Sequence, residues 1–253
     1  MVVEDDNKNE SAGNRNSNSK RGHDRDNDDL KGDFKNAIKR VMVPINPDGY
    51  AIIIVFCVIT FLLYLLWCFL GRIALILTLF AVYFFRDPER VSPDDDNCIV
   101  ASADGVVDKI EDTTLPKELG EGDEIYQRVS IFLNTFNVHV QRIPLDGKIT
   151  KTEYVEGKYL NITNDKYHED NERQIFLMEA DKGFKVAVVQ IAGLVARRIV
   201  FKKKQGDKVK LGERFGSIKF GSRVDVYLPK SVKIVMKVGQ LTIGGETVIG
   251  YIK

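Results

Sequence analysis

The sequence is poor in the residues that build disulfide-rich, metal-binding or nucleic-acid-binding proteins. Among 253 residues there are 3 cysteines, 3 histidines and 1 tryptophan, and the formal net charge is +1. Cys57 and Cys68 lie in an apolar segment and Cys98 stands alone, so the cysteines form neither a disulfide framework nor a metal-ligand spacing. We therefore expect a reducing compartment, no metal and no nucleic-acid partner.

The first 34 residues lack the large apolar side chains that a folded segment needs. Residues 1–34 are rich in Asn, Asp, Ser, Gly and Lys, and so cannot offset the entropy of ordering. We expect a disordered tail there. Its acidic residues argue against an organelle transit peptide, because such peptides are poor in acidic residues, and we therefore expect a bacterial chain. The remainder is long enough for one main domain with appendages, since 44% of all residues are apolar.

Charge is also missing from a long internal stretch. No charged residue occurs from Tyr50 to Leu70, and a second apolar run, Ile73 to Phe85, follows Gly71-Arg72. The first run is long enough to cross a bilayer and the second is short for a full span. Basic residues on both flanks favour two cytoplasmic ends, and predict a membrane-associated helical hairpin over residues 35–90 with its turn at Gly71-Arg72. The alternative is a buried core hairpin.

Residues 91–253 show short apolar alternations broken by Gly, Pro and Asp, which are typical of an all-β domain. The run Q-G-D-K-V-K-L-G-E-R-F-G-S-I from Gln205 is similar to V-G-Q-L-T-I-G-G-E-T-V-I-G-Y-I from Val238, which predicts two related half-motifs that pack together. These units resemble the barrel-sandwich hybrids of biotinyl and lipoyl carriers, so we expect a domain of that kind. Strands are expected at Cys98–Ala101, Gly105–Ile110, Val129–Leu133, Val138–Ile143, Lys148–Tyr154, Gln174–Glu179, Lys185–Ala192 and Ile199–Lys203.

The run from Arg214 to Pro229, R-F-G-S-I-K-F-G-S-R-V-D-V-Y-L-P, contains two Gly-Ser pairs in a β-strand pattern. Glycine tolerates strained backbone, so a serine hydroxyl that follows it can approach the preceding carbonyl group. An ordinary bulge or turn is the alternative for Gly-Ser within a strand.

This run, together with V-V-Q-I-A-G-L-V-A-R-R-I-V from Val188 and F-F-R-D-P from Phe84, resembles phosphatidylserine decarboxylases, and in particular their short bacterial (type A) form. The resemblance extends from about Pro44 to the C-terminus. It implies a carboxy-lyase of phospholipid biosynthesis that converts phosphatidylserine into phosphatidylethanolamine. Such an enzyme uses a pyruvoyl group made from its own serine as the electron sink, rather than pyridoxal phosphate.

The resemblance also implies a proenzyme that cleaves itself. The family's cleavage pair lies in F-G-S-R-V-D, which selects Gly221-Ser222 over Gly216-Ser217. Ser222 would become the pyruvoyl group, and chains 1–221 and 222–253 would stay together as a heterodimer, with a higher oligomer left open.

His139, in F-N-V-H-V-Q-R-I-P, matches the histidine that would activate Ser222, and Asp104, in S-A-D-G-V-V, matches the aspartate that would orient it. His139 alone among the histidines is expected on a core strand, since His23 lies in the tail and His168 in an irregular stretch. The alternatives are a structural histidine and an ordinary Asp-Gly turn.

Some assignments stay open. Some relatives carry a second histidine where this chain has Arg142. Arg197 and Arg198, near a lysine run at 202–204, are candidates for binding the lipid, or form a solvated loop. We expect the bacterial inner membrane, with the catalytic domain on the cytoplasmic side. The competing functions are a decarboxylase of another serine-headed lipid and a biotinyl-like carrier that uses Lys237.

Overall fold

The computed structural model describes residues 43–158, 170–193, 198–219 and 222–252. The chain divides into two units, residues 1–43 and 44–253, and every element described below belongs to the second. The predicted tail therefore lies outside the described residues.

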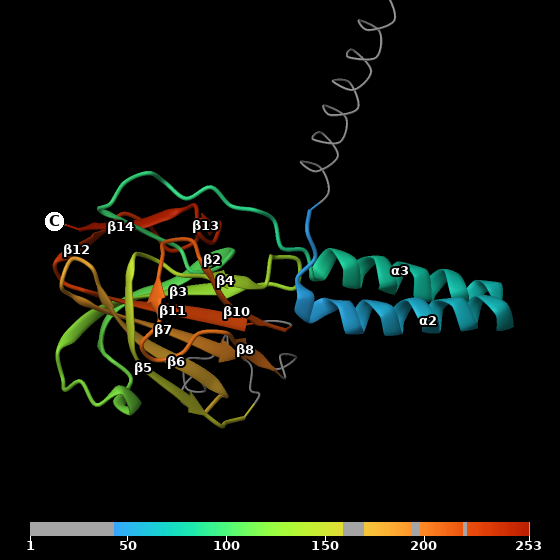
Figure 1. Ribbon diagram of the computed structural model, residues 1–253, viewed down its shortest axis with the longest axis horizontal. Helices are drawn as coiled ribbons and strands as arrows, with labels where there is room; N and C mark the ends of the chain where they lie inside the picture. Colours follow the sequence, from blue (N-terminus) through green and yellow to red (C-terminus); the bar gives the residue numbers. More distant parts are fainter. Residues whose placement is uncertain (1–42, 159–169, 194–197, 220–221, 253) are drawn as a thin grey trace, which may run out of the picture. The chain divides into compact units, whose positions relative to one another are not determined.

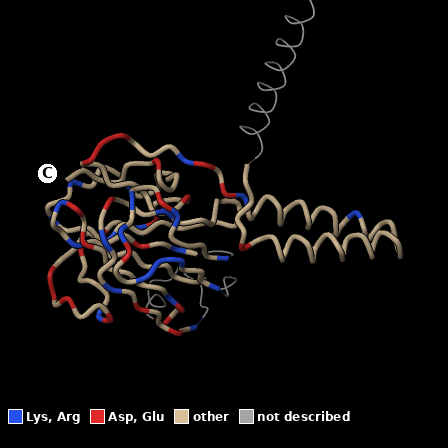
Figure 2. Tube along the Cα trace, viewed as in Figure 1, with Lys and Arg blue, Asp and Glu red and all other residues tan. Residues whose placement is uncertain are grey.

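Two apolar helices open the second unit. After η1 (Pro47–Gly49), α2 (Tyr50–Leu66) and α3 (Cys68–Phe84) lie side by side (Figure 1). The hydroxyl groups of Thr60 and Thr78 are hydrogen-bonded between them at 2.8 Å. The stretch Pro47–Leu66 is long and apolar enough to cross a membrane, whereas α3 has 17 residues and is shorter than a full span. Figure 2 shows a hairpin almost free of charge, and Arg72 is the one charged residue between residues 50 and 85.

The turn of this hairpin lies earlier than predicted. Trp67, with the extended dihedrals φ −156° and ψ 109°, separates the two helices, and Gly71-Arg72 lies within α3. A Cβ atom on Gly71 would lie 2.4 Å from Cδ2 of Tyr64 in α2. Glycine is therefore needed here for close helix packing and does not mark a turn. Arg72 is exposed near the start of α3.

The rest of the described chain is mostly β-sheet, as predicted. A curled eight-stranded sheet has the order β13-β2-β3-β11-β7-β6-β5-β9, and two three-stranded sheets have the orders β1-β14-β12 and β4-β10-β8 (Figure 1). A short helix, η2 (Lys117–Leu119), lies between β2 and β3. The strands are β1 (Cys98–Val100), β2 (Gly105–Thr114), β3 (Ile125–Leu133), β4 (Val140–Arg142), β5 (Gly147–Val155), β6 (Arg173–Ala180), β7 (Lys185–Ala192), β8 (Ile199–Phe201), β9 (Lys208–Val209), β10 (Arg214–Ile218), β11 (Ser222–Pro229), β12 (Val232–Ile234), β13 (Leu241–Thr242) and β14 (Val248–Ile252).

The central strand β11 is buried along its whole length and on both faces. Val224, Val226 and Leu228 belong to the main apolar core, whereas Tyr227 belongs to a second cluster on the opposite face. Because side chains alternate along a strand, Ser222 lies on the face of the main core, and Arg223 and Asp225 lie on the other.

The predicted repeat appears as matched turns. Gly206 and Gly212 in the first copy, and Gly239 and Gly245 in the second, all have positive φ angles, which glycine adopts with little strain. A Cβ atom on Gly245 would lie 3.5 Å from the Cα atom of Gly212. The two half-motifs therefore pack against each other at these turns, which confirms the prediction.

Candidate active site

Ser222 lies where three neighbouring strands are interrupted together. Strands β3, β11 and β7 are adjacent in the eight-stranded sheet, and β4, β10 and β8 are adjacent in a three-stranded sheet. The chain links β3 to β4, β10 to β11, and β7 to β8. Ser222 is paired with Leu133 and Ala192, the last residues of β3 and β7. The proposed cleavage pair therefore belongs to a junction between two sheets.

The two Gly-Ser pairs have different surroundings. Ser222 is fully buried, and its hydroxyl oxygen has no hydrogen-bond partner among the described residues. Gly221 lies outside those residues. Gly216-Ser217 instead lies within β10 and is paired with β4 on one side and β8 on the other. A Cβ atom on Gly216 would lie 2.2 Å from the carbonyl oxygen of Val200, so this glycine is required by strand packing.

His139 lies directly before β4 and not on a strand as predicted, although its carbonyl group accepts a hydrogen bond from the Ile218 N–H at 3.2 Å. Its imidazole is only 4% exposed. Nδ1 lies 2.9 Å from the Asn137 carbonyl oxygen, while Nε2 has no partner within the part of the chain that the structure describes. Nδ1 therefore carries the hydrogen, and Nε2 offers a lone pair.

The apolar helical hairpin covers this imidazole. The Phe84 ring, at the end of α3, lies 4.2 Å from the His139 ring, centroid to centroid. Burial lowers the pKa of His139 to about 4, with a smaller contribution from Arg86. His139 is thus neutral at pH 7 and can accept a proton at Nε2.

Asp104 has other partners. Its Oδ2 accepts a hydrogen bond from Nη2 of Arg90 at 2.8 Å, and its Oδ1 accepts one from the Gly244 N–H at 2.8 Å. Burial raises the pKa of Asp104 above its ordinary value. No hydrogen bond or ion pair between Asp104 and His139 occurs in the described ranges. The contact that orients the imidazole is the Asn137 carbonyl group, which the sequence did not indicate.

Arg142 is a structural clamp in this chain. Its guanidinium group donates to the carbonyl oxygens of Gly212 at 2.9 Å and Pro88 at 2.8 Å. Asp87, in the F-F-R-D-P motif, forms an ion pair with Arg214 at 2.8 Å and lies 3.5 Å from Arg142. These contacts fix the end of the hairpin to β4 and β10.

The basic candidates are only partly described. Arg197 lies outside the described residues, and Arg198 is exposed, with its carbonyl oxygen 3.3 Å from the Lys219 N–H. Lys202 and Lys203 each pair with a carboxylate, Asp48 and Glu213 respectively. Lys219, which the sequence did not indicate, lies in the β10–β11 link, and burial lowers its pKa. The ammonium group of Lys219 lies 3.4 Å from the carbonyl oxygen of Asp48 and 5.7 Å from the centre of the Phe85 ring.

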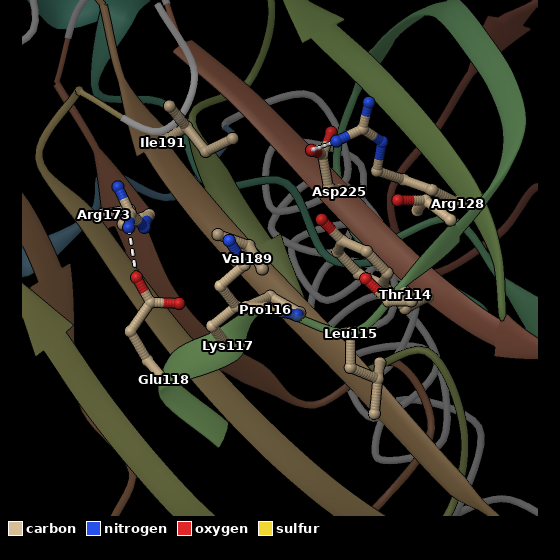
Figure 3. Close-up of a pocket in the computed structure, with 12 residues that line it drawn as sticks. Thr114, Leu115, Pro116, Lys117, Glu118, Arg128, Arg173, Val189, Ile191 and Asp225 are labelled. Atoms are coloured by element: carbon tan, nitrogen blue, oxygen red, sulfur yellow. Dashed lines mark hydrogen bonds and ion pairs between the residues drawn. The ribbon is translucent and has the colours of Figure 1, made fainter. Parts of the chain in front are cut away.

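A cavity of about 150 Å³ lies over the opposite face of the eight-stranded sheet, with Asp225 and Tyr227 of β11 in its lining (Figure 3). Arg128 lies 3.8 Å from Asp225 and Arg173 pairs with Glu118, while Lys117 adds a further cation to the lining. These lining residues alternate with those that face the main core, so the cavity lies on the side of β11 away from Ser222.

Comparison with known proteins identifies a family. Residues 77–250 match the family model described as phosphatidylserine decarboxylase. The chain is 48% identical over 206 residues to the phosphatidylserine decarboxylase proenzyme of Ruegeria pomeroyi, an alignment that covers 81% of this chain and 94% of the relative. It is 50% identical over 205 residues to the proenzyme of the same name from Rickettsia akari, covering 81% and 89%. The corresponding protein of Rickettsia typhi is 49% identical over the same shares.

Proposed function

Because the chain belongs to the phosphatidylserine decarboxylase family, we propose that it removes carbon dioxide from phosphatidylserine to give phosphatidylethanolamine. It is an enzyme, a carboxy-lyase, and its relatives are named as proenzymes. The structural observation that supports the proposal is the buried Ser222 hydroxyl at the junction of the two sheets, which has no partner among the described residues.

We propose that Ser222 becomes a pyruvoyl group by self-cleavage. Its hydroxyl oxygen adds to the Gly221 carbonyl carbon, and the C–N bond breaks to leave an ester and a free amino group. Elimination then breaks the ester C–O bond, giving a carboxylate on Gly221 and dehydroalanine at residue 222. Addition of water and loss of ammonia convert the dehydroalanine into the ketone. The pyruvoyl group supplies the electron sink that protein side chains lack.

His139 is the proposed base of this self-cleavage. Its imidazole is neutral, and its Nε2 atom has no partner in the described part of the chain, which suits the removal of the Ser222 hydroxyl proton. The Asn137 carbonyl group holds the required tautomer. Asp104 keeps a proposed secondary role, in which it holds the Arg90 guanidinium group in an ion pair and has no hydrogen bond to His139 in the described ranges.

The proposed architecture places the site at the membrane. Residues 35–90 would form the hairpin anchor, and residues 91–253 a barrel-sandwich-hybrid domain on the cytoplasmic side of the inner membrane. Exposed apolar side chains along α2 and α3 suit a lipid environment. Arg198 and Lys219 would bind the phosphate of the phosphatidylserine head group at the membrane surface. A membrane fraction that retains the protein after a high-salt wash is the expected result, because apolar insertion is not screened by salt.

The intact mass of the purified protein tests the cleavage chemistry. We expect chains 1–221 and 222–253, associated with each other, with the smaller chain lighter than its serine form by one ammonia. A full-length wild type that still decarboxylates phosphatidylserine would exclude the pyruvoyl mechanism. Assays on phosphatidylserine and on ether-linked serine lipids would separate the main proposal from the alternative substrate.

The carrier hypothesis has one supporting feature and a larger difficulty. Lys237 is exposed in a turn, where its carbonyl group accepts a hydrogen bond from the Gln240 N–H at 3.2 Å. However, the family to which the chain belongs consists of decarboxylases, so we do not propose a carrier function.

A further inference from the structure

Gln141 of β4 and Gln190 of β7 form a buried amide pair between the two sheets that meet at Ser222. Nε2 of Gln190 donates to Oε1 of Gln141 at 3.0 Å, and both side chains are fully buried. The other two amide atoms, Nε2 of Gln141 and Oε1 of Gln190, have no hydrogen-bond partner among the described residues. Buried polar groups are nearly always hydrogen-bonded, so we expect these two atoms to have a further partner.

The pair lies on the same face of the sheet as Ser222. In the pairing of β7 with β11, Gln190 is opposite Val224, two residues from Ser222 and on its face. Diagonal neighbours of this kind are within reach of long side chains. Gly216 leaves room for the amide, since a Cβ atom there would lie 3.0 Å from Nε2 of Gln190.

A purely structural role, in which a glutamine side chain bonds neighbouring strands, does not require amide atoms without a partner. Gln174 of β6 is opposite Gln190 in the same sheet and is also buried. Its Nε2 donates to the carbonyl oxygens of Glu153 at 3.0 Å and Ile175 at 3.1 Å. The amide nitrogen of the buried Gln174 thus has protein partners. The Gln141–Gln190 pair differs, because one donor (Nε2 of Gln141) and one acceptor (Oε1 of Gln190) have no partner among the described residues.

We propose that the Gln141–Gln190 pair binds the amino-acid head group of the lipid substrate. The Gln141 N–H donates to the carboxylate, and the Gln190 carbonyl oxygen accepts from the amino group. A neutral donor suits a carboxylate that is about to leave, because an arginine would stabilise the ground state through an ion pair that is lost in the transition state. This proposal rests on the function proposed above.

Binding to the mature but inactivated protein tests the proposal. Borohydride reduction of the mature protein removes the ketone, so short-chain phosphatidylserine and phosphatidylethanolamine can be titrated calorimetrically without turnover. For Gln141→Leu we expect the Kd of phosphatidylserine to rise roughly tenfold, the size of one lost hydrogen bond to a charged group, with the Kd of phosphatidylethanolamine unchanged. Gln190→Leu should weaken both lipids. Gln174→Leu is the matched control and should weaken neither.

The possible outcomes separate the two proposals. A wild type that is not cleaved and does not decarboxylate overturns the proposed function before any variant is compared. With a cleaved and active wild type, a Gln141→Leu protein that binds both lipids normally, or loses both equally, overturns the head-group site alone. If Gln141→Leu does not fold, Gln141→Met keeps the length of the side chain without the donor, and the same selective loss of phosphatidylserine is expected. Normal phosphatidylserine binding by Gln141→Met would also overturn the site.

Discussion

The two Gly-Ser pairs of this chain are nearly identical in sequence and opposite in setting. Gly216-Ser217 lies within β10, between two paired strands, and the Ser217 hydroxyl lies 3.5 Å from a carboxylate oxygen of Asp48. Ser222 is the first residue of β11, where it pairs with Leu133 and Ala192, and its hydroxyl has no partner among the described residues. Both serines are thus paired with strands on two sides, and the difference lies in the hydroxyl group, because the proposed self-cleavage needs a hydroxyl with no competing partner.

The most direct way to break this comparison is to exchange the two serines for alanine separately. Ser222→Ala should remain one full-length chain without decarboxylase activity, since the attacking oxygen is gone. Ser217→Ala should mature normally, because it loses only a long contact with Asp48. Denaturing gels and intact mass give the answer for both variants. Cleavage in Ser222→Ala, or its loss in a folded Ser217→Ala, would exchange the roles assigned to the two pairs.

The sequence was sufficient for the motifs but not for the contacts between them. Alternating apolar residues predicted the strands well, and β7 has the predicted bounds, Lys185–Ala192. Gly71 misled the prediction of the hairpin turn, because a glycine that permits close helix packing has the same local signature as one that ends a helix. The bonding of Asp104 to Arg90 could not be predicted, since it depends on how distant segments meet.

Removal of the proposed base should have the next largest effect. His139→Ala should slow self-cleavage about 100-fold to 10,000-fold, the usual contribution of a positioned general base. A time course of chain cleavage measures the rate, and circular dichroism verifies the fold. A folded His139→Ala protein that cleaves at the normal rate would show that the junction activates Ser222 by another group. The comparison of the two pairs would then rest on the hydroxyl group of Ser222 alone, which has no partner among the described residues.

The covering of His139 by Phe84 can be tested through pH. Burial lowers the pKa of His139 from 6.5 to about 4 in the folded protein. As the pH falls below about 6.5, the histidine of the unfolded chain becomes protonated while that of the folded protein does not, so the stability of the fold decreases. Self-cleavage of the wild type should stay level from pH 7 to about 5, because the imidazole remains neutral.

Phe84→Ala should raise this pKa by exposing the ring, and move the inflection of the cleavage rate towards pH 6.5. Phe80→Ala is the control, since the Phe80 ring packs on Phe84 and Phe136. An unchanged inflection in Phe84→Ala would mean that the hairpin does not set the protonation of His139.

The smallest effect is expected for Asp104, and here sequence and structure give different predictions. The family resemblance makes Asp104 the orienter of His139, so that Asp104→Asn would slow self-cleavage strongly. In the structure its two carboxylate oxygens accept hydrogen bonds from Arg90 and from the Gly244 N–H, and an asparagine could still accept the one from Gly244. The lost ion pair is partly offset because a buried carboxylate no longer has to be desolvated, as the raised pKa of Asp104 indicates.

We therefore expect Asp104→Asn to lower the free energy of unfolding by about 1 kcal/mol and to slow cleavage less than threefold, the range of one modest hydrogen bond. Arg90→Gln removes the same ion pair but leaves the Asp104 carboxylate buried, so it should lower the free energy of unfolding more than Asp104→Asn does, and slow cleavage equally little. Strong inhibition by Asp104→Asn with normal cleavage in Arg90→Gln would favour the family assignment, because only a direct action of the carboxylate on the junction would separate the two variants.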